Sequence, residues 1–463
     1  MPETVAALSG SFRGDSVLDS VLGSALDSVT KSFRFSSGPA GSPVRNFLQP
    51  VGNAAAGIAE LALTAAKETA EQAENPAAEA PEEQDGTDRK QAKDVISYYY
   101  YTRISKEERL LYDAMLGLAE GTSLEESRIV GINPSSEEFA ERYTRAYNAL
   151  VSDHPELFWI AQARVSFECR YYVVPSFGGK YKVVLSLSGS KDDYAEEQRR
   201  LEESAEKLLR KADLTGSDAE IALQLHDLLI ENAWYNGTAG PDDYAHTAYG
   251  ALVENSSGIP GGALCDGYSL AYEYLLQRAG VTCTMVCGYA GSSQDDLQKH
   301  AWNLVRLGED WYEVDPTWDD LELEISPSSE GYDLFQEAIS DRDYMAKLHH
   351  YMFNRTTEQM RSFTPGDEYT YTSDSGWVSL LQPSVHIRFT PQESEVTRDY
   401  VTPLAPDAEG SLYTWEVLTG KESSNKKNDQ KEANSQPISN HQAVNDQSKG
   451  SQQAANKQSP GSQ

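Results

Sequence analysis

The sequence has only four cysteines among its 463 residues. So few cysteines exclude a small scaffold that is held together by many disulfides. Basic residues are also scarce, because 39 Lys and Arg stand against 72 Asp and Glu, for a net charge of −33. This balance argues against a nucleic-acid-binding protein, since contacts with phosphates need a basic surface. It also argues against a polybasic protein of the membrane surface.

A long hydrophobic run is absent as well. The most apolar stretch, 54–66, contains Glu60 and is shorter than the ~20 residues that a membrane-spanning helix needs. The first residues, Met1–Thr4, do not include the basic segment of a signal peptide, and no uninterrupted apolar segment follows them. We therefore expect no transmembrane segment, and either a cytoplasmic protein or one whose export signal lies outside this sequence.

Composition separates the two ends of the chain from its middle. Residues 1–94 are poor in aromatic residues and end in a Glu-, Ala-, Gln- and Pro-rich stretch, while 421–463 are rich in Ser, Asn and Gln and contain no aromatic residue. Such segments bury too little apolar surface to offset the entropy that ordering costs. We expect both ends to be disordered or of low complexity. The 26 Tyr and 7 Trp nevertheless require a folded core, which we place at 95–420.

The middle divides further by its local patterns. We predict a helical and β-hairpin front section at 95–214, a catalytic core at 215–322 and a C-terminal α/β extension at 323–420. The front section contains two S-x-x-E capping boxes and two β-rich runs around a Gly-Gly turn. The predicted capping residues and strands are Ser105, Ser135, 164–174 and 180–188.

Cys265 directly precedes a helical pattern. A Gly-rich loop leads into it, and apolar residues then recur at helical spacing until Gly280. A thiol at a helix N-terminus faces backbone N–H groups and the positive end of the helix dipole, which favours its nucleophilic thiolate form. The same N–H groups can stabilise an oxyanion during acyl transfer.

Two β-rich runs lie on either side of the Gly-Glu pair that follows Leu307. Gly in the first position of a two-residue turn suits a type II′ hairpin. This register places Asp315 opposite Trp302, and so on the same face as His300. The diagonal neighbours are then ~7–8 Å apart along the backbone, within reach of a carboxylate and an imidazole. A thiol, an imidazole and a carboxylate are the groups that nucleophilic catalysis needs.

These segments resemble the transglutaminase-like superfamily, most closely its bacterial members of papain-like fold. Three runs carry the resemblance: Cys265–Tyr268, His300–Asn303 and Trp311–Trp318. The resemblance covers about 220–320 and implies an α+β fold, in which a helix that bears the cysteine packs on an antiparallel sheet that bears the histidine and the acid. It also implies a candidate triad of Cys265 as nucleophile, His300 as base and Asp315 as orienting acid.

Other polar residues receive weaker assignments. Tyr249 and Trp302 are candidates for supporting an oxyanion or lining the substrate groove. His226 is expected to be a satisfied helix histidine, and Asp319 and Asp320 to lie in a solvated acidic turn rather than to bind calcium. The His and Cys spacing matches no zinc site, so we expect no metal, and the chemistry of the candidate triad requires no cofactor.

The sequence therefore predicts a thiol enzyme that acts on amide or peptide bonds through a thioester. Water would resolve the thioester in a peptidase or amidase, and an amine would resolve it in a transglutaminase. Two alternatives stay open: a non-catalytic peptide-binding module on the same fold, and an acyltransferase for small molecules. The negative charge lies mostly in 95–420 and predicts either a basic or Lys-bearing protein or peptide substrate or a role in solubility alone. The resemblance implies a secreted or surface location.

Overall fold

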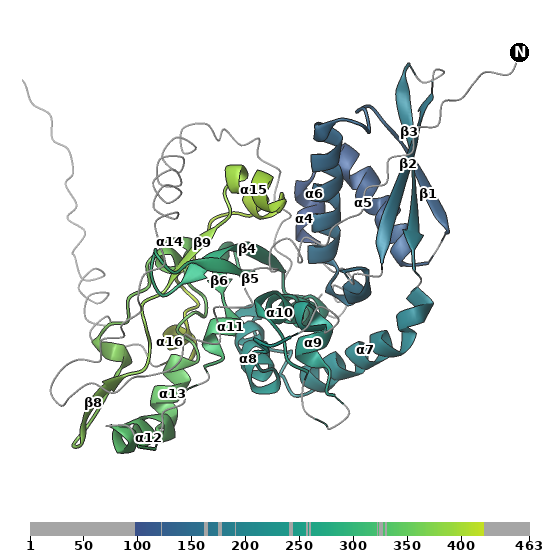
Figure 1. The fold of residues 1–463 in the computed structure, drawn as a ribbon. Helices are drawn as coiled ribbons and strands as arrows, with labels where there is room; N and C mark the ends of the chain where they lie inside the picture. Colours follow the sequence, from purple (N-terminus) through teal and green to yellow (C-terminus); the bar gives the residue numbers. More distant parts are fainter. Residues whose placement is uncertain are drawn as a thin grey trace, which may run out of the picture. The chain divides into compact units, whose positions relative to one another are not determined.

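The computed structural model in Figure 1 describes most of the central part of the chain. It describes residues 98–420 except 122, 162–164, 175–177, 190, 240–243, 256–257, 259–260, 322, 324–326 and 329–330. The disorder predicted for 1–94 and 421–463 lies outside the described residues. The described residues as far as Leu418 belong to one compact unit.

Three helices form most of the front of this unit: α4 (Tyr99–Arg103), α5 (Lys106–Ala119) and α6 (Glu137–Asp153). The capping box predicted at Ser105 is confirmed, because its side chain and that of Glu108 each bind the other's backbone N–H. The cap predicted at Ser135 is wrong by one residue. Ser136 caps α6 instead, since its hydroxyl accepts from the backbone N–H of Phe139 at 3.2 Å.

A three-stranded antiparallel sheet with the order β1-β3-β2 stands beside these helices (Figure 1). The predicted hairpin is confirmed as β2 (Ser166–Val174) and β3 (Lys180–Ser188). The first strand, β1 (Glu125–Val130), was not predicted and pairs with β3. Helix α5 packs against β1 and β3.

The central helix of the unit is α10 (Cys265–Ala279), which ends at Gly280 with a φ of +81°. Every residue of α10 except Arg278 is buried, as expected for a helix that is covered on all sides. It packs on four other helices and on two strands of the second sheet. The four helices are α7 (Ala195–Leu209), α8 (Asp218–Asn232), α9 (Ala248–Leu252) and α11 (Pro316–Asp319).

The second sheet is four-stranded and antiparallel, with the order β6-β5-β4-β9. Its strands are β4 (Cys283–Gly291), β5 (Gln298–Leu307), β6 (Asp310–Val314) and β9 (Val385–Arg388). The predicted register between β5 and β6 is confirmed, because Leu307 pairs with Asp310 and Asn303 with Val314. Gly308 in the turn has a φ of +62°, as the first position of a type II′ turn requires.

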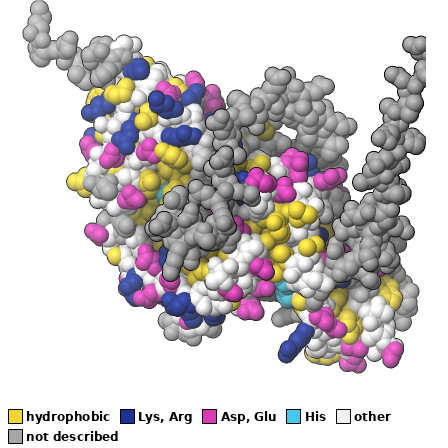
Figure 2. Space-filling view, turned by 180° about the vertical axis from the view of Figure 1, so that it is seen from behind, with side chains coloured by type: hydrophobic (Ala, Val, Ile, Leu, Met, Phe, Trp, Pro, Cys, Tyr) yellow, Lys and Arg dark blue, Asp and Glu magenta, His cyan; other side chains and the backbone are white. Residues whose placement is uncertain are grey.

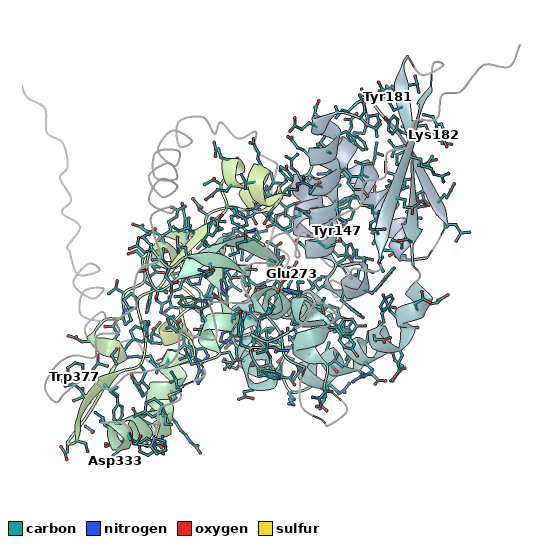
Figure 3. The ribbon with its side chains drawn as sticks, viewed as in Figure 1. Tyr147, Tyr181, Lys182, Glu273, Asp333 and Trp377 are labelled. Atoms are coloured by element: carbon teal, nitrogen blue, oxygen red, sulfur yellow. The ribbon has the colours of Figure 1, made fainter. Side chains whose placement is uncertain are left out.

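The C-terminal extension, predicted to be α/β, contains both helices and strands. Strand β9 forms the edge of the central sheet, while β7 (Thr370–Ser373) and β8 (Gly376–Ser379) pair separately. Helix α12 (Tyr332–Ser340) packs against β8, and Figure 3 marks this part of the molecule with Asp333 and Trp377. The remaining helices are α12 (Tyr332–Ser340), α13 (Arg342–Leu348), α14 (Thr357–Arg361), α15 (Pro391–Thr397) and α16 (Trp415–Leu418).

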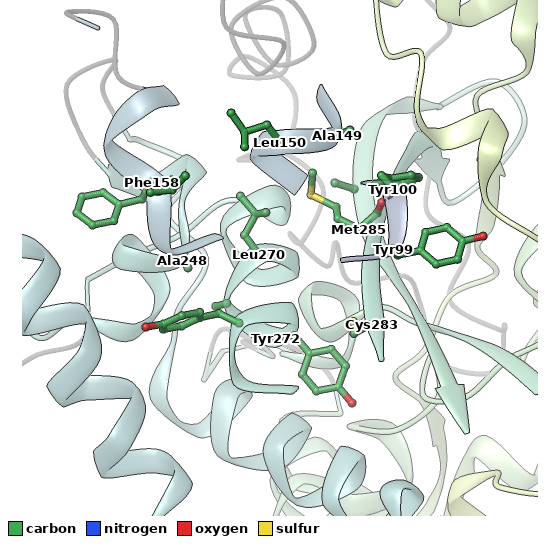
Figure 4. Packing of buried hydrophobic residues seen from close by; sticks show 14 of the residues in the cluster. Tyr99, Tyr100, Ala149, Leu150, Phe158, Ala248, Leu270, Tyr272, Cys283 and Met285 are labelled. Atoms are coloured by element: carbon green, nitrogen blue, oxygen red, sulfur yellow. Dashed lines mark hydrogen bonds between the residues drawn. The ribbon is translucent and has the colours of Figure 1, made fainter. Parts of the chain in front are cut away.

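One hydrophobic core joins the front section to the helix that carries Cys265. Figure 4 shows Tyr100 and Leu150 from the front beside Leu270 of α10 and Met285 of β4. The Tyr100 hydroxyl donates to the backbone oxygen of Met285 at 2.7 Å. The predicted α+β class is confirmed, since helices pack on antiparallel sheets. No helix among the described residues is both long and apolar enough to cross a membrane.

Candidate active site

Cys265 is the first residue of α10, and its side chain belongs to the buried core with 3% exposure. Close backbone packing fixes the start of this helix. The N–H of Leu264 donates to the backbone oxygen of Ala245 at 2.8 Å, and a Cβ atom at Gly267 would lie 2.2 Å from that same oxygen. A larger residue at this position would therefore displace the first turn that holds the thiol.

His300 and Asp315 meet as the predicted hairpin requires. Nε2 of His300 on β5 lies 2.6 Å from Oδ2 of Asp315, which directly follows β6. The other oxygen of Asp315 accepts the backbone N–H groups of Thr317 and Trp318 at 3.0 and 3.3 Å and so caps α11. The carboxylate is fully buried, and these bonds fix its orientation.

The thiol of Cys265 lies close enough to His300 for its charge to raise the pKa of the ring. Nε2 of the ring binds Asp315, which leaves Nδ1 as the ring nitrogen available to the thiol. Burial opposes protonation of this imidazole, but Asp315 and Cys265 outweigh burial and raise the pKa of His300 to about 10. The two neighbours therefore favour the imidazolium form, which the ring adopts when it takes the thiol proton.

His386 of β9 is a fourth polar member of the site, and the sequence prediction missed its role. Its Nε2 lies 2.9 Å from the Asp315 oxygen that also binds His300. Burial, the largest influence, lowers the pKa of His386, so the neutral ring donates from Nε2. Burial alone would raise the pKa of Asp315, but His300 and His386 together hold it well below its usual range. The only sequence signal was a polar residue at a buried strand position.

Trp302 forms a wall behind His300. The two rings stack with centroids 6.0 Å apart and an interplanar angle of 22°. The indole N–H donates to Oε2 of Glu313 at 2.7 Å, and Trp302 is fully buried. Its observed contacts hold the His300 ring in place.

Tyr249 lies on α9, and its hydroxyl faces α7. It accepts a hydrogen bond from Nη1 of Arg200 at 2.9 Å, and its ring packs between Phe158 and Tyr244. A different tyrosine lies nearer the thiol. Burial raises the pKa of the half-buried Tyr235, and the next largest influence on it is the charge of Cys265. The sequence prediction did not single out Tyr235.

The prediction of a solvated acidic turn after Trp318 is wrong for Asp319. Asp319 is fully buried, with Oδ2 3.1 Å from Nε2 of His226 and Oδ1 accepting the backbone N–H of Met352 at 2.8 Å. Asp320 accepts from the Tyr268 hydroxyl. His226 is fully buried, as expected for a helix histidine packed inside, and each of its ring nitrogens lies 3.1 Å from a carboxylate oxygen. Sequence patterns did not reveal the burial of Asp319, because its partner is 93 residues away.

A small cavity of about 40 Å³ lies beside His300. Apolar side chains such as Leu270, Met285 and Phe158 line it together with Asp266. Nδ1 of His246 lies 2.9 Å from Oδ2 of Asp266 at this cavity. The cavity thus offers a mainly apolar space next to the imidazole, and polar side chains such as Asn148, His154 and Asp399 also line it.

A family model for the transglutaminase-like superfamily matches residues 206–316. Residues 206–316 are a transglutaminase-like domain. All three members of the candidate triad lie inside this domain, whereas His386 lies beyond its matched end. The domain therefore completes its central sheet and the hydrogen bonding of its acid with a strand from outside the family match.

Two curated relatives are similar to this domain. One is the kyphoscoliosis peptidase of Mus musculus, which is 30% identical over 112 residues that cover 21% of this chain and 17% of the relative. The other is the kyphoscoliosis peptidase of Homo sapiens, which is 41% identical over 61 residues that cover 12% of this chain and 9% of the relative. The chain thus matches less than a fifth of the length of either relative.

Two solved structures also show some likeness. One is described as a TGase and aligns with a TM-score of 0.22 at 12% identity, over 38% of this chain and 51% of that chain. The other is the periplasmic domain of TgpA from Pseudomonas aeruginosa bound to ethylmercury, which aligns with a TM-score of 0.19 at 21% identity, over 30% of this chain and 55% of that chain. These low scores carry no argument about function.

Proposed function

We propose that this protein is a thiol enzyme that acts on amide or peptide bonds through its candidate triad. The observation that carries the proposal is the His300 imidazole, which is hydrogen bonded to Asp315 and lies close enough to the Cys265 thiol for the charge of the sulfur to raise the pKa of the ring. Nucleophilic catalysis needs a nucleophile, a base and a group that orients the base. The transglutaminase-like domain, in which all three residues lie, supports the same conclusion.

In the proposed reaction, His300 takes the proton of the Cys265 thiol, and the sulfur attacks the carbonyl carbon of the substrate. The C–N bond then breaks, His300 passes its proton to the leaving amine, and a thioester remains on Cys265. Asp315 stabilises the imidazolium throughout and holds the ring in one orientation. Water or a second amine then attacks the thioester and releases the thiol.

Hydrogen-bond donors near the sulfur are candidates for stabilising the developing oxyanion. The backbone N–H groups at the start of α10 are one source, because Cys265 is the first residue of that helix. Tyr235 is a second source, since its phenol lies close enough for the charge of Cys265 to raise its pKa. Tyr249, which the sequence favoured for this role, binds Arg200 through its hydroxyl.

The proposed substrate is a protein or peptide, with a preference for basic or Lys-bearing segments. The net charge of −33 supports this preference, and Figure 2 shows acidic side chains spread over the described part of one face rather than gathered in one patch. If the preference is electrostatic, added salt will lower kcat/KM for basic peptides more than for neutral ones. If salt lowers kcat/KM equally for basic and neutral peptides, the negative charge serves solubility and not substrate preference.

One observation favours a second candidate, a non-catalytic peptide-binding module. Cys265 is only 3% exposed and His300 only 7%, so a substrate carbonyl reaches the sulfur only if the site opens. A binding module would hold its peptide equally well after Cys265→Ala and would turn nothing over.

Selective alkylation of the thiol tests the proposal. We expect iodoacetamide near neutral pH to label Cys265 much faster than the other three cysteines. All four cysteines are buried and none forms a disulfide, so faster labelling of Cys265 would report activation of its thiol and not greater exposure. Mass spectrometry of tryptic peptides locates the label. Cys169→Ala is the matched control, because this buried residue lies in the front sheet and its loss leaves the fast label in place. No preference for Cys265 over the other thiols would refute the enzyme proposal.

The reaction class follows from product analysis. Wild type and Cys265→Ala are incubated with a peptide library in the presence and absence of a primary amine. A cleaved peptide indicates a peptidase, a carboxamide converted to an acid indicates an amidase, and an incorporated amine indicates transfer as in transglutaminases. An acyl group from a small thioester donor, trapped on Cys265, would point instead to a small-molecule acyltransferase.

A further inference from the structure

A second cluster of ionisable side chains lies outside the candidate active site, between α8 and the end of α13. His226 and Asp227 are neighbours on α8, and His350 follows α13. Oδ1 of Asp227 is 3.1 Å from Nδ1 of His226 and 2.6 Å from Nε2 of His350. One nitrogen from each ring and one carboxylate oxygen all lie within 4.8 Å of one another.

The nitrogen of each ring that lies away from Asp227 also has a partner. Nε2 of His226 lies 3.1 Å from Oδ2 of the buried Asp319, and Nδ1 of His350 lies 2.5 Å from the backbone oxygen of Ala346. Histidines that bind metals almost always donate their other ring N–H to a carboxylate or a backbone carbonyl in this way. Both rings therefore have the support that metal-binding imidazoles need, and it comes from outside the cluster.

The hydrogen count of the two rings points to a cation. Because the Ala346 carbonyl only accepts, Nδ1 of His350 carries the single hydrogen of the neutral ring. Nε2 then has a lone pair that faces the Asp227 carboxylate at 2.6 Å. His226 faces a carboxylate at each of its nitrogens, and its neutral ring has only one hydrogen to give. If every one of these contacts is to be satisfied, the cluster needs two protons more than the two neutral rings carry, or an equal positive charge of two.

Two extra protons or one divalent ion would supply that charge. Two protons would create adjacent imidazolium rings with centroids 5.2 Å apart, in a place where His226 is fully buried and His350 is 7% exposed. Like charges at that distance in a buried site repel each other. A divalent ion places the same charge at one point and balances the two carboxylates of Asp227 and Asp319.

We propose that Nδ1 of His226, Nε2 of His350 and the Asp227 carboxylate bind a divalent transition-metal ion, with Zn²⁺ as the ion that fits best. Zn²⁺ binds imidazole and carboxylate ligands tetrahedrally at about 2.0–2.2 Å, which keeps ligand atoms roughly 3.3–3.5 Å apart. The cluster needs only small side-chain movements to reach this spacing. The Asp227 side chain is 43% exposed, so water can reach the fourth position.

The proposed ion would stabilise the candidate active site without contacting its residues. His226 binds Asp319, the last residue of α11, and α11 begins directly after Asp315, which caps it. Asp319 also accepts the N–H of Met352, so α8, α11 and the segment after α13 meet at this cluster. The metal would therefore stabilise the elements that hold the acid of the candidate triad.

Zinc content and thermal stability of the full chain test the proposal. The protein is stripped with a chelator, dialysed against Zn²⁺ and then against metal-free buffer, and assayed by elemental mass spectrometry and by its melting temperature. The test variants are Asp227→Asn and His350→Gln. His349→Gln is the matched control, because this neighbouring histidine binds the Asp319 backbone oxygen and is outside the cluster. Cys265→Ala controls for zinc on the candidate triad.

We expect wild type, His349→Gln and Cys265→Ala to retain about one zinc per chain and to gain several degrees in melting temperature with zinc. Both test variants should lose the zinc and the gain. Circular dichroism will show whether His350→Gln folds. If it does not, Asp227→Asn still tests the proposal, because the Asp227 side chain is half exposed. Wild type without zinc, test variants with as much as wild type, or zinc lost only in Cys265→Ala would each overturn the proposal. The cluster would then be a network of imidazolium and carboxylate groups.

Discussion

Nε2 of His386 lies 2.9 Å from Oδ2 of Asp315. The same oxygen binds His300, so the two imidazoles share one acceptor. A hydrogen bond to a charged group contributes ~1.5–3 kcal/mol, and its loss would weaken the hold of Asp315 on the His300 imidazolium. We predict that His386→Phe slows alkylation of Cys265 about tenfold near neutral pH and shifts its pH profile.

The control for His386 is a variant that keeps a donor. The amide of His386→Gln can still donate to Asp315, so this variant should retain most of the wild-type rate. Circular dichroism establishes that both variants fold. Equal rates for wild type and His386→Phe would show that the second histidine only fills space at the edge of the sheet.

Asp315→Asn should be far more harmful. The amide oxygen can still cap α11, but the amide nitrogen would donate to Nε2 of His300 and force the ring hydrogen onto Nδ1, the nitrogen that has to accept the thiol proton in the proposed reaction. The equivalent change in a serine-protease triad lowers kcat about 10⁴-fold, and we expect a loss of about 10³- to 10⁴-fold in turnover. Asp310→Asn, on the exposed end of β6, is the control. A loss below about tenfold would contradict the assigned role.

The stability of the protein should fall as alkaline pH deprotonates His300. Burial works against the charged ring, but Asp315 and Cys265 raise the pKa of His300 from 6.5 to about 10 in the folded protein. A raised pKa stabilises the folded state fully below pH 6.5, and this contribution is lost as the pH rises to about 10. The gap in urea midpoint between wild type and His300→Gln should therefore shrink over this window. A gap that stays constant would contradict the raised pKa.

Replacement of Glu273, near the middle of the fold in Figure 3, should stabilise the protein, whereas replacement of His300 destabilises it. Burial, helped by the charge of Asp153, raises the pKa of Glu273 well above 4.5. The folded protein therefore keeps a proton that the unfolded chain releases, and stability falls as the pH rises above 4.5. Glu273→Gln removes this loss, so urea midpoints should favour the variant increasingly between pH 5 and pH 8. Glu203→Gln, on the exposed face of α7, should show no such trend.

Local signals in the sequence predicted the local parts of the site. The cap at Ser105 and the Gly-Glu turn after Leu307 depend on neighbours within a few residues, and both lie where they were predicted. The Gly-Glu turn also sets the register of β5 and β6, which brings Asp315 next to His300. Strand β1 was missed because its sequence, EESRIV, contains little apolar alternation. Its β structure comes from pairing with β3.

Local sequence patterns did not predict the contacts between residues that are far apart in the sequence. Nothing near His386 shows that its strand will pair with β4, and its acceptor is 71 residues away. The Asp319 carboxylate looked like part of a solvated turn because His226, its buried partner, is 93 residues earlier in the chain. Such contacts arise from the packing of whole elements, which one sequence without relatives does not specify.

The position of β9 in the sheet has a consequence for biosynthesis. A ribosome releases the transglutaminase-like domain, 206–316, well before it makes Val385–Arg388. Until that strand arrives, the edge of β4 is unpaired, and exposed edges invite pairing with other chains. The nascent chain therefore passes through a stage in which the Cys265, His300 and Asp315 codons have been translated but the sheet is still incomplete. Chaperone demand should peak in that interval, and expression trials that stop at 316 should yield aggregates.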